Sequence, residues 1–195
     1  MGSEMCIRDR YIIMDTNKLF SELADLGVCS SGRRLWGRSN KDVDMIIKVW
    51  KRWPEYLMEH STPALEIVRR YFSSEPDLKK LEDNRIYLDR QINIELGSEE
   101  SVFVMGDSSG VINIRDWATV KLYCFNDISL NIKCGFHSYV SVECYDRSVL
   151  SVLSNKGTCT VYAYDDSSID APCDPVRVIR KKLSRGQVFN GEEIY

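Results

Sequence analysis

Histidine, paired cysteines and long apolar runs are all scarce in this 195-residue chain. Its two histidines, His60 and His137, have no cysteine or carboxylate nearby at ligand spacing, and none of its seven cysteines forms a Cys-x-x-Cys pair. These absences argue against a zinc site and a disulfide framework, and they favour reduced thiols in a cytoplasm. No apolar run approaches the ~20 residues of a membrane helix. We therefore expect a cytoplasmic protein that binds no metal, cofactor or membrane.

Composition and charge are those of an ordinary globular protein. The chain has 26 Lys+Arg against 29 Asp+Glu, a net charge of −3, and 44% hydrophobic residues. Such values exclude a disordered chain and a general nucleic-acid-binding surface. The glycine-rich phosphate loop, the Gly-x-Ser-x-Gly elbow and the His-Glu-x-x-His motif are missing as well. We therefore predict that the protein is not an enzyme.

Residues 14–80 show helical periodicity and predict a small helical domain. Asp15 or Thr16 can cap a first helix that stops at Gly27, and a second helix is expected from Asp42 to Trp53. Pro54 opens a short third helix, and Thr62 with Pro63 begins a last one, which ends at 73–76. Residues 28–40 are rich in glycine and serine and are expected to form a loop.

From about residue 84 the period changes to two, and a ten-residue repeat appears. Three columns carry it, each listed from the N-terminal unit onwards: Val102, Ile112, Leu122, Ile132, Val142 and Val152; Val104, Ile114, Cys124, Cys134, Cys144 and Ser154; Ser98, Ser108, Ala118, Ile128, Ser138 and Ser148. Each unit predicts one strand and one turn, with the first two columns pointing inward. The third column, of mostly small residues, suits a tight corner.

These repeats predict an α+β fold in which a parallel β-solenoid over 84–171 follows the helices. An antiparallel meander or sandwich is the alternative, but the turns lack the Asn-Gly or Asp-Gly of two-residue hairpins. Two units make one coil of some twenty residues, about four coils in all, with one residue inserted near Gly157. Residues 172–195 are expected to form a last strand and a basic tail. The helical half would cap one end and this tail the other, whereas an uncovered end would promote a homodimer in place of a monomer.

Two resemblances bear on origin. The units Trp117–Tyr123, Ser148–Val152 and Thr158–Tyr164 resemble the Asn-(Ser/Ala)-x-Val-x-Ala repeats of uncharacterised β-helical proteins from phages and gut bacteria. The resemblance implies a solenoid from a phage or mobile element and transfers no catalytic residue. Residues 4–10 resemble a translated sequencing adaptor, so we expect residues 1–13 to be a non-native or disordered leader and Met14 to be the native start.

Polar residues inside and between the units have two interpretations each. Cys124, Cys134 and Cys144 at spacings of ten are expected to be buried small residues, with Cys124 and Cys144 stacked and Cys134 facing elsewhere, in preference to a metal site. Aspartates recur in the turns and are expected to bond their own backbone there, in preference to forming the acid/base pair of a sugar-cleaving β-helix. These residues are Asp107, Asp116, Asp127, Asp146, Asp165 and Asp166.

Basic residues interleaved with tryptophan give the candidate binding surface. If Trp36 is exposed among arginines it is typical of an interface anchor, for a protein or for a nucleic-acid backbone. The candidate interface consists of Arg33, Arg34, Trp36, Arg38, Lys51, Arg52 and Trp53, and a basic tail adds Arg180, Lys181, Lys182 and Arg185.

The predicted function is a protein-binding module of phage or mobile-element origin. We expect its partner to be a bacterial host protein, for example a defence component that it inhibits by occluding a surface in the host cytoplasm. A polysaccharide-acting β-helix enzyme and a structural phage or cell-surface component are the alternatives. This inference is an analogy at the level of the fold.

Overall fold

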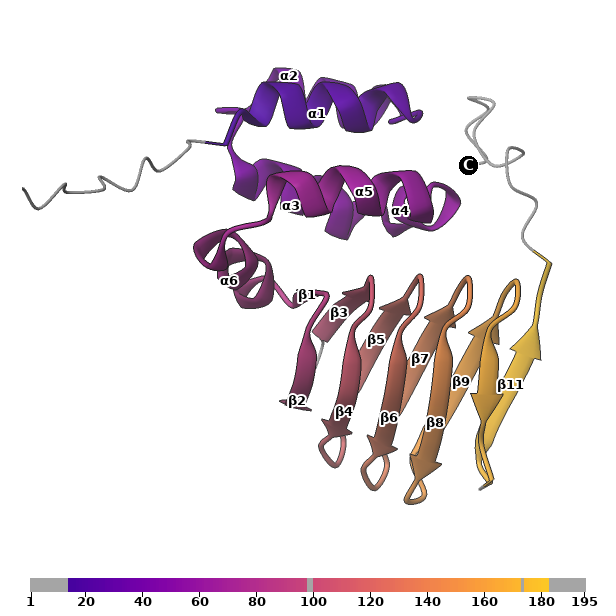
Figure 1. Ribbon diagram of the computed structural model, residues 1–195. Helices are drawn as coiled ribbons and strands as arrows, with labels where there is room; N and C mark the ends of the chain where they lie inside the picture. The colour runs from indigo at the N-terminus through magenta and orange to yellow at the C-terminus, as the bar shows by residue number, and fades with distance from the viewer. Residues whose placement is uncertain (1–13, 98–99, 173, 183–195) are drawn as a thin grey trace, which may run out of the picture.

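The computed structural model describes residues 14–97, 100–172 and 174–182. Within them, a helical half is followed by a parallel β-solenoid, which confirms the predicted fold class (Figure 1). The helices are α1 (Thr16–Asp25), α2 (Ser30–Gly37), α3 (Val43–Arg52), α4 (Pro54–Glu59), α5 (Ser61–Tyr71) and α6 (Glu75–Asp83). In this part of the chain, no helix is long and apolar enough to cross a membrane. The adaptor-like segment lies outside the described residues.

Short polar side chains begin three of the helices. Asp15 accepts a hydrogen bond from the Lys18 N–H at the start of α1, Asp42 caps α3 in the same way, and Ser74 caps α6. The last predicted helix does end just before residues 73–76, at Tyr71, but Ser74 then starts a further helix, α6, that was not predicted. The predicted loop over 28–40 was wrong, since α2 occupies its centre.

The strands form two parallel sheets that wind around one axis. Sheet A has the order β1-β3-β5-β7-β9-β11 and sheet B the order β10-β8-β6-β4-β2. All nine strand pairs between described residues are parallel, so the antiparallel alternative was wrong. The bounds are β1 (Ile86–Leu88), β2 (Gln91–Leu96), β3 (Glu100–Met105), β4 (Ser109–Ile114), β5 (Thr119–Cys124), β6 (Ser129–Cys134), β7 (Tyr139–Cys144), β8 (Val149–Ser154), β9 (Thr158–Ala163), β10 (Ser168–Asp170) and β11 (Val176–Arg180).

Two ten-residue units make one coil, as predicted. Leu122 pairs with Val142 in sheet A, one coil of 20 residues later. The next coil is one residue shorter, because Val142 pairs with Val161, so the insertion predicted near Gly157 is in fact a deletion. Among the described residues the strands β1 to β10 make five coils, in place of the predicted four, and β11 opens a sixth.

The solenoid interior is the stack of aliphatic side chains that the repeat columns predict. Val102, Leu122, Val142 and Val161 on sheet A and Ile112, Ile132 and Val152 on sheet B are all fully buried. Lys121 and Asn131, from the intervening positions, are exposed. Cys124 stacks on Cys144 in sheet A whereas Cys134 lies in sheet B, as expected. Burial raises the pKa of the Cys124 thiol well above its ordinary value, so it stays protonated.

Each coil turns two corners, and small side chains line both. Ser108, Ser138 and Ser148 are buried, and each Oγ donates to the carbonyl three residues earlier, at 2.7–2.8 Å. The small third column of the repeat therefore has the corner role predicted for it.

The helical half lies along one line of corners. Met105 at the end of β3, Phe125 just after β5 and Tyr145 just after β7 are buried in one core with the helices, which lie along this side of the solenoid (Figure 1). We call the turns that follow β1, β3, β5, β7 and β9 the helix-side corner, and those that follow β2, β4, β6 and β8 the outer corner. α6 packs beside the first strand, β1, at the end where we expected the helical half to form a cap, and α5 lies along the helix-side corner, which it contacts through Ser61 and Arg69. The described part of the tail forms β11, which pairs with β9.

Candidate binding surfaces

The predicted basic loop around Trp36 belongs to the packing of the helical half. Trp36 is only 6% exposed and stacks on Phe20, with ring centroids 4.5 Å apart. Arg33 donates to the carbonyls of Ala24 and Val28 at 2.7 and 3.1 Å, and so satisfies the C-terminal end of α1. The exposure expected for Trp36 was therefore wrong. Arg34 on α2 and Arg38, which follows the helix, are exposed.

Most of the other basic candidate residues contact a carbonyl oxygen or an aromatic ring of the chain itself. Lys51 donates to the carbonyl of Asn84 at 3.1 Å, and Arg52 lies 5.2 Å from the ring centroid of the half-buried Trp53. In the tail, Arg180 donates to the carbonyl of Ser167, and Lys181 lies over the Tyr162 ring at 4.3 Å; Lys182 is exposed. Arg185 lies outside the described residues.

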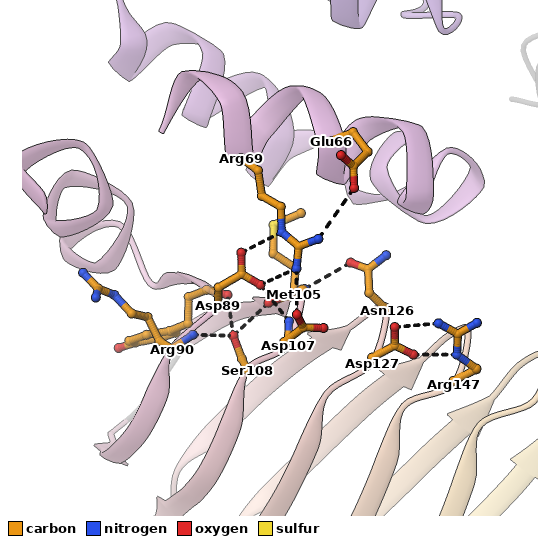
Figure 2. A network of polar contacts seen from close by, with 12 residues as sticks. Glu66, Arg69, Asp89, Arg90, Met105, Asp107, Ser108, Asn126, Asp127 and Arg147 are labelled. Atoms are coloured by element: carbon orange, nitrogen blue, oxygen red, sulfur yellow. Dashed lines mark hydrogen bonds and ion pairs between the residues drawn. The ribbon is translucent and has the colours of Figure 1, made fainter. Parts of the chain in front are cut away.

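Arg69 of α5 joins the helical half to the helix-side corner. Its guanidinium donates twice to Asp89, at 2.7 Å each, and once to Asp107 at 3.1 Å (Figure 2). Burial alone would raise the pKa of Asp89, but the hydrogen bonds from Arg69 and from the Asp107 N–H lower it overall. Asp89 is therefore ionised and paired with Arg69.

Side chains of the helix-side corner also bind one coil to the next. Gly106, Asn126 and Asp146 occupy the same turn position in successive coils, and all three have a positive φ. The Asn126 Oδ1 accepts from the Gly106 N–H at 3.1 Å, and the Asp146 Oδ2 accepts from the Asn126 N–H at 2.9 Å. Ser61, the first residue of α5, donates to the other oxygen of Asp146 at 3.0 Å. The expectation that these aspartates bond their own backbone was therefore wrong for Asp116 and Asp146, which accept from backbone N–H groups 20 residues away, in a neighbouring coil.

A groove of about 520 Å³ runs between α5 and these turns. Carboxylates outnumber cations in its lining, which consists of Thr62, Leu65, Glu66, Arg69, Asn126, Asp127, Asp146, Arg147, Asp165 and Asp166. Arg147 donates to both oxygens of Asp127 at 2.6 Å and thereby lowers the pKa of that carboxyl. No group of three or more His, Cys, Asp or Glu side chains in the described part of the chain could hold a metal ion.

The outer corner carries an exposed group of rings that the sequence did not single out. We call Trp117, Phe136, His137 and Tyr139 the aromatic patch. Trp117 is 70% and Tyr139 58% exposed, and the imidazole of His137 is exposed as well. The rings of Trp117 and His137 have centroids 4.5 Å apart, and Phe136 meets His137 edge-on at 3.9 Å. These turns lie on the side of the solenoid away from the helices (Figure 1).

The outer turns place two of these rings at left-handed backbone positions, as the next outer turn does with Lys156, whose φ is 57°. Trp117 and His137 have φ of 62° and 53°, in the left-handed region that costs most residues about 1–2 kcal/mol. The helix-side corner uses Asn126, Asp146 and Asp165 at such positions, which are residue types that tolerate this conformation. An exposed indole at a costly backbone position breaks the local sequence preference for that position. Natural proteins break such preferences mainly at functional sites. In a ten-residue alignment Trp117 and His137 share a column with Asp107, Asp127 and Arg147, so two rings stand where other turns carry charged side chains.

Comparisons with known proteins found no match: no family model, no curated protein and no solved structure is significantly similar to the chain.

Proposed function

We propose that this chain is a non-enzymatic protein-binding module that docks its partner on the aromatic patch. The observation that carries the proposal is Trp117, which is 70% exposed at a left-handed corner position and lies at a tilt against the ring of His137. Tryptophan and tyrosine dominate the energetic centres of protein interfaces. Because neighbouring rings already hold one another, the entropy lost on binding is small. The parallel solenoid behind the patch supplies a stiff support.

The partner that we propose is a bacterial host protein. This part of the proposal is supported by the resemblance of the repeat units to those of phage and gut-bacterial proteins. In this picture the module acts in the host cytoplasm and inhibits by covering a surface of the host protein. The binding area would be the side of the solenoid that the helical half leaves uncovered.

The test replaces Trp117 with asparagine, which tolerates the left-handed backbone and removes the ring. The protein, Trp117→Asn and Val149→Ala are immobilised and exposed to bacterial lysate, and captured proteins are quantified by mass spectrometry. Val149 is an exposed apolar residue at the other corner. We expect a captured protein that Val149→Ala retains and that Trp117→Asn loses by about a hundredfold, an effect of interface-anchor size. Its direct affinity for both variants is then measured by calorimetry. Equal affinity for both variants, or no selective capture, would refute the proposal.

The acidic groove favours one alternative, an enzyme that acts on polysaccharides. Several carboxylates line it, as a glycosidase needs. Against this, Arg147 keeps Asp127 ionised, whereas a general acid needs a raised pKa.

The enzyme alternative has a simple discriminating experiment. Polysaccharides of several charge types are incubated with the protein and with Asp146→Asn, and released reducing ends are measured. If the groove is catalytic, the protein releases sugar and the variant loses about a hundredfold in rate, since it lacks one acid/base group. We expect no release by either protein.

A further inference from the structure

The last strand of sheet A presents an open edge. β11 pairs with β9 on one side, and no strand among the described residues pairs with its other side (Figure 1). Val178 is 38% exposed although its partner Val161 is fully buried, because no further coil covers it. A free edge of this kind is a ready template for another extended chain.

The backbone groups of this edge can be assigned from the pairing. The Lys181 N–H donates to the Ala163 carbonyl of β9 at 2.9 Å. Since N–H groups along a strand alternate in direction, those of Arg177 and Ile179 also face β9. The N–H groups of Val178 and Arg180 point away from β9, where they can donate hydrogen bonds to the carbonyls of an added strand.

Charge selects the strand that fits. Residues 174–182 read Asp-Pro-Val-Arg-Val-Ile-Arg-Lys-Lys, with four cations and one carboxylate. Within residues 14–97, 100–172 and 174–182, no carboxylate forms an ion pair with Arg177, Arg180, Lys181 or Lys182. Their like charges oppose pairing with a second copy of this edge. They attract a strand that carries carboxylates.

We propose that the free edge of β11 binds an acidic, extended segment of a partner protein by β-strand addition. Main-chain hydrogen bonds to Val178 and Arg180 hold the added strand, and Arg177 and Lys181 recognise its carboxylates. This site goes beyond the proposed function, because it is separate from the aromatic patch. The experiments below test this site independently of any binding at the aromatic patch.

Two synthetic peptides test the proposal. One alternates glutamate and valine over seven residues, and its counterpart has lysine for glutamate; both carry a fluorophore and blocked ends. Anisotropy titrations with the full chain at low salt should show binding of the acidic peptide about tenfold or more tighter than the basic one, weakening as salt rises. Hydrogen exchange by NMR should show new protection at the Val178 and Arg180 amides. Equal binding of both peptides, or protection elsewhere, overturns the proposal.

Variants separate the edge from general charge effects. Arg177→Glu with Lys181→Glu should weaken binding of the acidic peptide about tenfold and favour the basic one. Lys121→Glu with Lys133→Glu makes the same change on exposed residues of inner strands and should leave both affinities as they were. Val178→Pro removes a free donor and leaves the bonds to β9 intact, so it should abolish binding. If the acidic peptide binds only to a chain ending at Lys182, the chain's own C-terminal residues hold the edge, and the proposal is wrong.

Discussion

Replacing Gly110 with valine is expected to destabilise the protein by about 3–5 kcal/mol, as a clash inside a packed structure and a strained backbone act together. The substitution looks harmless in sequence, because the repeat has Val120, Leu130, Val140 and Leu150 in this column. In the structure Gly110 has a φ of 139°, and a Cβ there would lie 1.9 Å from the carbonyl oxygen of Ile92. With this φ a Cβ would point at the backbone of Ile92, the residue of β2 with which Gly110 pairs.

Equilibrium unfolding in urea, followed by circular dichroism, measures the loss. Gly37→Ala is the control, because a Cβ at Gly37 meets nothing within 4 Å. Gly37 ends α2, and alanine there is expected to change stability by less than about 1 kcal/mol. A Gly110→Val protein as stable as this control would show that the first coil can move away from β4.

Truncation of Phe125 to alanine is expected to cost about 3–5 kcal/mol, the range for a buried phenylalanine. Phe125 is fully buried and lies between Phe103 and Tyr145, with ring centroids 6.3 Å from each. All three belong to the core shared by the helices and the helix-side corner. Losing the ring removes contacts on both sides of that boundary, so the helical half and the solenoid should loosen together.

The matched control is the same truncation at the outer corner. Phe136 is half-buried, so Phe136→Ala should cost less than about 1.5 kcal/mol. Urea unfolding of both variants gives the comparison, and binding of a hydrophobic dye at low urea reports whether the helices separate before the solenoid. Similar losses for Phe125→Ala and Phe136→Ala would contradict the assignment of Phe125 to the shared core.

The candidate surfaces were less predictable than the fold. In a ten-residue alignment Met105, Phe125 and Tyr145, with Tyr164 one residue early, share a column with Arg115, Gly135 and Asn155. A twenty-residue alignment separates them into an apolar set at the helix-side corner and a polar set at the outer corner. That separation indicates which corner is covered, and it was present in the sequence. The burial of Trp36 had no such signal, since it depends on Phe20 in another helix.

The sequence by itself determined the solenoid, its inward columns and its coil length. These properties repeat in every unit, and like residues must stack when parallel strands of one period wind around a common axis. The tertiary structure alone decided where the helical half lies, why Gly110 cannot follow its column, and that Trp117 and His137 meet on an open corner. Each of these depends on a single contact between residues distant along the chain, so no repeated pattern records it.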